Sequence, residues 1–205
     1  MKNGKRSVQT TFAMAAALVG LLWCTVGLDS SANAQMTGQD KRWIEYTAEG
    51  KLIRPPVSFR KWVFVGTPVT PNDMNDGKAN FPEFHNVYMD PDSFAYLEKT
   101  GQYRDGTVLV KELVSVGSKE AASGKGYFQG EFIGLEAAVK DAKRYPNDPG
   151  NWGYYSFGHS YPLKDVSEKN KIKECNNCHE ENAVNFVFSQ YYPVIRAVIE
   201  MSKQK

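Results

Sequence analysis

Alternating apolar and polar positions, with β-branched and aromatic residues, mark a series of extended segments through the middle of the chain. These segments are residues 62–67, 86–89, 107–116, 127–139 and 152–157. Runs of this kind, separated by Gly, Pro, Asn and Asp, are typical of β-strands. The two longest runs flank the turn-rich residues 117–126, so we expect them to pair as an antiparallel hairpin.

Helical signals are fewer. Asp90 offers an N-cap followed by Pro91 at the first helical position, and Gly101 predicts the end of this short helix. Near the C-terminus, the apolar pattern of residues 184–201 predicts a closing helix that is interrupted near Pro193.

The most specific chemistry lies in the run Cys175-Asn176-Asn177-Cys178-His179. Two thiols three positions apart at the start of a helix can add to both vinyl groups of one haem, and the adjacent His179 can then ligate the iron. The motif therefore predicts a c-type cytochrome with one covalently bound haem c per chain.

Other uses of a C-x-x-C pair are a zinc half-site or a redox disulfide. A structural zinc site needs four ligands, and the remaining histidines, His85 and His159, have no recognisable ligand spacing. A thioredoxin-like pair is expected after a strand in a βαβ pattern, whereas this one follows a polar stretch. Haem attachment is favoured over both.

The order of the elements defines the fold class. A strand-rich body comes first and the haem motif last, with no internal repeat. We expect an α+β fold, a predominantly antiparallel β-sheet with short helices and a C-terminal haem-binding helical segment. The haem should lie between the sheet and the terminal helices.

The N-terminus predicts export. Residues 1–34 have a basic start, an apolar stretch and a small-residue site ending at Ala34, as in a secretory signal peptide. An uncleaved membrane anchor is the alternative, but the apolar stretch is short for a span, so we expect no stable membrane insertion. The predicted organisation is signal peptide 1–34, N-terminal arm 35–56 and haem domain 57–205, located in the periplasm.

Cleavage after Ala34 leaves 205 − 34 = 171 residues, enough for one domain. The basic count falls from 25 to 22 and the acidic count from 23 to 22, so the mature chain is formally neutral. Neutrality argues against nucleic-acid or anionic-membrane partners and leaves only local charged patches to steer a partner. Removal of Cys24 leaves no thiol for a structural disulfide.

Seven segments resemble the cytochrome P-460 family. They are residues 62–67, 75–78, 104–108, 110–117, 134–141, 149–152 and 190–193. The resemblance runs from about Trp62 to Arg196 and so covers nearly the whole predicted domain.

The resemblance implies a five-coordinate haem with His179 as proximal ligand and an open distal face. It places the family's porphyrin-bonded lysine on Lys111 and its distal proton-relay carboxylate on Glu136. The implied reaction oxidises hydroxylamine to nitric oxide and nitrous oxide, passes electrons to an external acceptor such as a small cytochrome, and occurs in a homodimer. Relatives called cytochromes c′-beta share the fold, lack the lysine bond, cap the iron with apolar residues and bind nitric oxide instead.

The residues themselves leave the role of Lys111 open. Alternation places it between Leu109 and Leu113 on one strand face, where a lysine is costly unless it is neutralised or paired. A bond between its nitrogen and the haem would remove the ammonium. The alternative is an edge-strand lysine that reaches water or pairs with a glutamate.

Alternation also places Glu136 on one face with Phe128, Gly130, Phe132 and Gly134. The two glycines would leave room for a flat macrocycle, and an apolar pocket would raise the pKa of the carboxylate toward the working pH. An exposed glutamate at a strand end is the alternative.

Three function classes follow. The chain could be an enzyme that oxidises hydroxylamine, a binding protein that captures nitric oxide without turnover, or an electron carrier with a side chain as sixth iron ligand. His85, His159 and Met89 are the candidates for a sixth ligand, and none has support beyond its residue type. Lys111 and Glu136 favour the enzyme.

Overall fold

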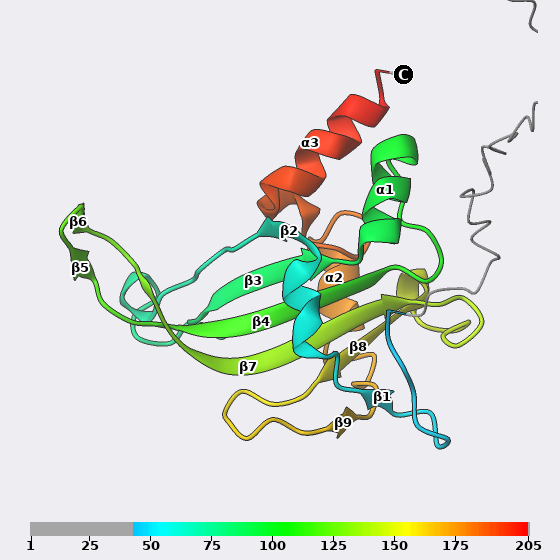
Figure 1. The fold of residues 1–205 in the computed structure, drawn as a ribbon, viewed down its shortest axis with the longest axis horizontal. Coiled ribbons are helices and arrows are strands. Elements are labelled where there is room, and N and C mark those ends of the chain that lie inside the picture. The colour runs from blue at the N-terminus through cyan, green and yellow to red at the C-terminus, as the bar shows by residue number, and fades with distance from the viewer. Residues whose placement is uncertain (1–42, 205) are drawn as a thin grey trace, which may run out of the picture. The chain divides into compact units, whose positions relative to one another are not determined.

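A five-stranded antiparallel sheet forms the centre of the computed structural model, which describes residues 43–204 (Figure 1). In spatial order its strands are β2 (Val63–Gly66), β3 (Phe84–Met89), β4 (Val108–Val116), β7 (Gln129–Lys140) and β8 (Trp152–Ser156). The predicted hairpin is confirmed as β4 and β7, and the α+β class is confirmed. The predicted signal peptide, residues 1–34, lies outside the described residues.

Two small ribbons accompany this sheet. The strands β5 (Glu120–Ala121) and β6 (Gly124–Lys125) form the tip of the β4–β7 hairpin. The strand β1 (Leu52–Ile53) pairs with β9 (Val166–Ser167), and Leu52 is fully buried. The described part of the predicted arm therefore contributes to the packed core.

Three α-helices and four short 3₁₀ turns complete the described chain. They are η1 (Val57–Lys61), η2 (Asn72–Met74), α1 (Pro91–Thr100), η3 (Pro149–Asn151), α2 (Asn176–Asn182), η4 (Ser189–Tyr191) and α3 (Pro193–Ser202). As expected, α1 ends at Gly101, which takes a left-handed φ of 69°. Within residues 43–204, no helix has both the length and the apolarity needed to cross a membrane.

The predicted closing helix differs from the observed structure. The helix α3 begins at Pro193, whose missing N–H is harmless at a first helical position, instead of being interrupted there. The preceding residues are not helical, because Asn185 and Phe186 take positive φ values of 53° and 64°. The prediction of helix for residues 184–192 is therefore wrong, apart from the single turn η4.

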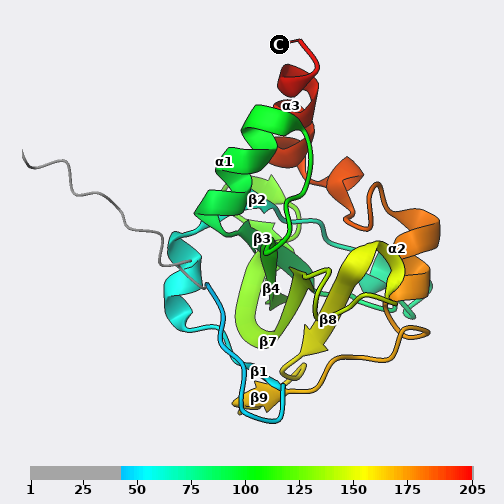
Figure 2. The ribbon, with the colours of Figure 1, turned by 90° about the vertical axis from the view of Figure 1, so that its right-hand side faces the viewer.

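The sheet is covered on both faces. The face that carries Val87, Met89, Leu109 and Tyr154 packs against α1 and α3 and is called the helix-side face from here on. The opposite face packs against η1, β1 and Tyr145. Figure 2 shows α1 and α3 next to each other, with α2 beside β8.

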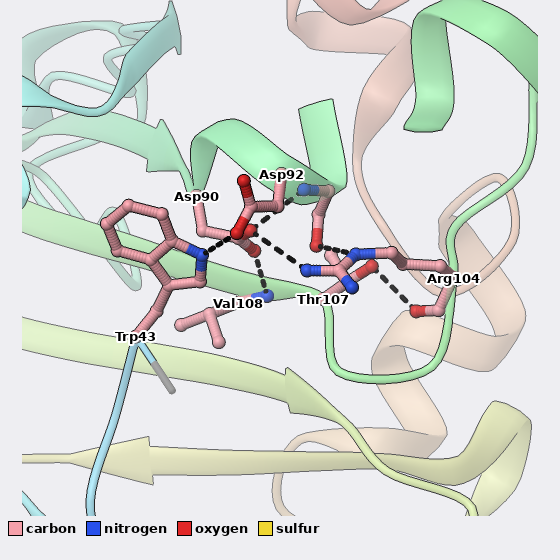
Figure 3. A network of polar contacts seen from close by, with 7 residues as sticks. Trp43, Asp90, Asp92, Arg104, Thr107 and Val108 are labelled. Carbon is pink, nitrogen blue, oxygen red and sulfur yellow. Dashed lines mark hydrogen bonds and ion pairs between the residues drawn. The ribbon is translucent and has the colours of Figure 1, made fainter. Parts of the chain in front are cut away.

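A buried carboxylate joins α1 to the sheet (Figure 3). Asp90 accepts hydrogen bonds from the backbone N–H groups of Ser93 and Val108, each at 2.8 Å, and its Oδ1 lies 3.6 Å from the Arg104 guanidinium. The same side chain is therefore the N-cap of α1 and a bridge to the first residue of β4. This fixes the position of α1 over the helix-side face.

Candidate haem and proton-transfer site

The two motif cysteines lie on one side of a short helix. Cys175 is the N-cap residue of α2, and Cys178 and His179 follow three and four positions later, so all three side chains share one helix face. Both thiols are free, Cys175 half-buried and Cys178 exposed. This arrangement presents two thiols and one imidazole to the same side, as a covalently attached haem requires.

His179 is held in one orientation by its neighbours. Its ring lies between Tyr154 and Phe188, with centroid distances of 4.3 and 4.6 Å. Its Nδ1 lies 2.9 Å from the Phe186 carbonyl oxygen, which also accepts a hydrogen bond from the Tyr154 hydroxyl. A carbonyl only accepts, so Nδ1 carries the proton and Nε2 keeps its lone pair for a metal.

The ionisation of His179 also suits an iron ligand. Burial lowers the pKa of His179, against the bond to the Phe186 carbonyl, so the imidazole is neutral at physiological pH. A neutral imidazole with a free Nε2, beside two free thiols, fits a haem c. Cys175, Cys178 and His179 are the residues that would hold it.

Lys111 and Glu136 face each other across the centre of the sheet. They are direct partners in the β4–β7 register, and their side chains form an ion pair of 2.5 Å. The strand β4 has neighbours on both sides, so the alternative of an edge-strand lysine is wrong. The glutamate partner that this alternative also named is present, and it is Glu136.

His159 completes a polar cluster with this pair. Its Nε2 lies 2.9 Å from Glu136 Oε1, and 46% of its side chain is exposed. Burial pushes the pKa of Glu136 upward, but the His159 bond and the Lys111 charge outweigh it and lower the pKa to about 2. The expectation of a raised pKa is therefore wrong for the carboxylate as it stands between these two side chains. The Glu136 bond in turn raises the pKa of His159.

The predicted surroundings of Glu136 are also wrong, because β7 carries a bulge. Leu113 pairs with Gly134, but the next residue of β4 pairs with Phe132, so Ile133 is an extra residue. The bulge turns Phe132 to the opposite face, where it contacts Arg60. A regular alternation of strand faces does not allow for the extra residue Ile133, so it places Phe132 on the wrong face.

The glycines of this segment do not leave an open space either. A Cβ on Gly134 would lie 2.6 Å from the Gly158 carbonyl oxygen and 3.1 Å from the His159 Cα, and one on Gly130 would lie 3.1 Å from the Gly117 Cα. Backbone therefore fills both places. The close approach at Gly134 brings the loop of His159 beside Glu136.

Phe81 and His85 border the polar cluster. The Phe81 ring centroid lies 5.2 Å from Lys111 Nζ, 6.1 Å from the His85 ring and 6.4 Å from the His159 ring. Burial lowers the pKa of His85 to about 4, which keeps it neutral. The sequence offered no signal for Phe81, which lies outside the regular strands.

The polar cluster and the haem motif lie on the same face of the sheet. Glu136 pairs with Ser156 in the β7–β8 register, two residues from Tyr154, the residue that packs on His179. The charges of Lys111 and Glu136 both act on the pKa of His179. Of the other candidate ligands, Met89 is fully buried in the core under the helices.

Comparison with known proteins agrees with this geometry. The family model described as Cytochrome P460 matches residues 56–189, a range that includes Lys111, Glu136 and the motif from Cys175 to His179. No curated protein matches the chain.

Proposed function

Because the chain belongs to the cytochrome P460 family of redox-active haem proteins, we propose that it is a periplasmic c-type cytochrome that oxidises hydroxylamine to nitric oxide and nitrous oxide. Cys175 and Cys178 would attach one haem, His179 would be its proximal ligand, and Lys111 would bond to the porphyrin rim. Electrons leave to an external acceptor such as a small cytochrome, and the protein acts as a homodimer.

The observation that carries this proposal is the polar cluster of Lys111, Glu136 and His159 on the face shared with His179. An electron carrier would need no carboxylate and imidazole on the sheet face beside the residues that would hold the haem. A protein that only captures nitric oxide needs no base, because nitric oxide binds without releasing a proton. Oxidation of hydroxylamine releases protons and requires a group that accepts them.

A bound haem would supply the iron site for hydroxylamine and would take up the electrons of the substrate. Glu136 accepts a proton from the substrate, and the 2.9 Å contact passes it to His159. His159 is exposed over almost half of its side chain, so it can release the proton to water. The chain therefore contains a short route from a half-buried base to solvent.

Lys111 controls the basicity of Glu136. As an ammonium 2.5 Å from the carboxylate it holds the pKa of Glu136 down, together with His159. A bond between its nitrogen and the porphyrin would remove this positive charge. The pKa of Glu136 would then rise, so the bond that anchors the haem would also make Glu136 a stronger base.

Two measurements test the proposal. One is the absorption spectrum of the ferrous protein, and the other is the rate of dye-coupled hydroxylamine oxidation. A lysine bond interrupts porphyrin conjugation, so we expect the main band far to the red of an ordinary c-type haem, together with turnover. An ordinary c-type spectrum, nitric oxide binding and no turnover would favour the cytochrome c′-beta function instead.

A further inference from the structure

Lysines gather on the segment that runs through β9 to the haem-motif helix α2. Residues 164–173 contain Lys164, Lys169, Lys171 and Lys173. The first three, together with Lys51 beside β1, line an open hollow of about 390 Å³. This part of the chain therefore presents a local positive patch on a mature domain whose formal charge is neutral.

Ion pairs neutralise only part of this patch. Glu168 pairs with Lys51 at 2.9 Å, and Asp148 pairs with Lys169 at 2.7 Å. In the part of the chain that the structure describes, Lys164, Lys171 and Lys173 are exposed and have no acidic side chain within ion-pair distance. Of the nearby acidic side chains, Asp165 pairs with Arg54, whereas Glu174 lines the same hollow and accepts a hydrogen bond from the Lys171 backbone N–H. The surplus is therefore three lysines against one carboxylate.

Apolar side chains are exposed among these lysines. Val166 is 37% exposed and Ile172 is 38% exposed, and Ile172 stands between Lys171 and Lys173. We call Lys164, Val166, Lys171, Ile172 and Lys173 the lysine surface. Small apolar areas with a charged rim are typical of brief contacts between redox proteins, in which charge guides the encounter and little area is buried.

The lysine surface adjoins the haem attachment directly. The side-chain amide of Asn170 donates to Cys175 Sγ at 3.3 Å, and the backbone N–H of Asn177 donates to the Ile172 carbonyl at 3.1 Å. The lysine surface is thus connected, through the backbone and one hydrogen bond, to a thiol that would hold the haem. A protein seated there would lie beside Cys175, one of the two thiols proposed to attach the haem.

From this placement we propose that the lysine surface is the docking site for a soluble one-electron acceptor protein with an acidic surface. The proposal rests on the proposed function, since NH₂OH → NO + 3H⁺ + 3e⁻ requires three one-electron acceptors per hydroxylamine, each leaving in its reduced form. The neutral mature chain has no overall field, so steering of an acidic partner must come from a local patch.

The test compares the haem-loaded wild type with two variants of equal net charge. The first changes Lys164, Lys171 and Lys173 to Glu, and the matched control changes Lys78, Lys99 and Lys143, which are also exposed and lie elsewhere in the fold, to Glu. The probe is the acidic soluble domain of cytochrome b5, titrated by calorimetry at low ionic strength. We expect the first variant to bind about tenfold more weakly, or worse, and the control to stay within about twofold of wild type.

Equal losses in both variants, or no loss in the first, would overturn the docking site. Binding of anionic phospholipid vesicles in preference to the acidic protein would also overturn it, because the surface would then be a membrane site. Dye-coupled turnover separates the two proposals, since a dye does not need the surface. If no protein oxidises hydroxylamine but only the first variant loses binding, the enzymatic function is refuted and the docking site is supported. If turnover is normal but the first variant binds as well as the control, the docking site is refuted and the enzymatic function is supported.

Discussion

Lys111 and Glu136 are direct cross-strand partners at the centre of the sheet, and their side chains form an ion pair of 2.5 Å. The lysine proposed to bond the haem and the carboxylate proposed to accept protons are therefore one coupled unit. The charge of Lys111 lowers the pKa of Glu136, so a change in that charge changes how readily the carboxylate accepts a proton. Variants at the two positions should therefore not behave additively.

The first prediction concerns the haem-motif cysteines. Replacing Cys175 or Cys178 by Ser should weaken covalent attachment, because each free thiol would supply one of the two proposed thioether bonds. Replacing both should leave Lys111 as the only attachment point. Intact mass under denaturing conditions measures the bound haem. Full retention in every variant, with an unmodified Lys111 peptide, would contradict the motif assignment.

The second prediction concerns the Lys111 bond. Lys111→Arg keeps a positive charge opposite Glu136 but removes the amine that would bond the porphyrin. We expect this variant to keep its thioether-bound haem and to show the ferrous band of an ordinary c-type haem. Lys125→Arg, on the exposed β6, is the matched control and should keep the wild-type spectrum. A Lys111 peptide of unmodified mass in haem-loaded wild type would refute the bond.

The third prediction concerns the carboxylate that holds α1 to β4. Asp90→Ala removes the N-cap, leaves the Val108 N–H without its acceptor and breaks the ion pair with the Arg104 guanidinium (Figure 3), so the free energy of unfolding should fall by about 2–4 kcal/mol. Asp92→Ala in the same turn, which removes an exposed acceptor of the Trp43 indole, should cost less than about 1 kcal/mol. Urea unfolding measures both, and equal losses would show that the Asp90 contacts are not important for stability.

Local signals explain which parts of the fold could be predicted. The start of α1 is determined by the N-cap side chain of Asp90 and the backbone preference of Pro91, and its end by Gly101. These local preferences are visible in the sequence, so they predict the helix correctly. The β4–β7 hairpin was likewise predictable from two long alternating runs on either side of a turn. The prediction of helix for residues 184–192 failed because apolar spacing gives no information on the positive φ values of Asn185 and Phe186.

The site was predictable only in part, because its geometry depends on long-range packing. The motif from Cys175 to His179 is local and specific. The direct pairing of Lys111 with Glu136 depends on the register, and the bulge at Ile133 changes the alternation within the same strand. The place of His159 depends on the contact between Gly134 and Gly158, which are distant in the sequence.

The fourth prediction concerns the pH dependence of stability through His159. Its folded pKa is raised, mainly by the Glu136 bond, so protonated His159 stabilises the fold fully below its unfolded pKa of 6.5. This contribution is lost as the pH rises through the folded pKa. The Tm of wild type should therefore fall relative to that of His159→Gln as the pH is raised from about 5 to about 9.

The control for this prediction is His85→Gln. Burial lowers the pKa of His85 to about 4, below its unfolded pKa of 6.5, so its effect on stability has the opposite sign: neutral His85 is fully tolerated above its unfolded pKa and costs stability as the pH falls below it. The Tm of wild type should therefore rise relative to that of His85→Gln between about pH 5 and 7, and the difference should stay constant from about pH 7.5 to 9. A constant difference between wild type and His159→Gln would contradict the coupling between His159 and Glu136.

The last prediction separates the enzyme from the gas-binding protein. Glu136→Gln keeps the size of the side chain but removes the base, so hydroxylamine oxidation should slow by about 10²–10⁴-fold. Nitric oxide binding should change little, because a neutral diatomic gas needs no proton acceptor. Glu131→Gln, on the same strand but exposed, is the matched control and should turn over at the wild-type rate.

Dye-coupled turnover and nitric oxide titration of the same haem-loaded preparations decide between the outcomes. If Glu136→Gln matches an active wild type, the carboxylate only orders Lys111 and His159, and another group must carry the proton. If Glu136→Gln loses turnover and nitric oxide binding together, the variant has damaged the haem site and not the proton route. Loss of turnover alone is the result that assigns the base, because Glu136 touches both the lysine proposed to bond the haem and the histidine that reaches solvent.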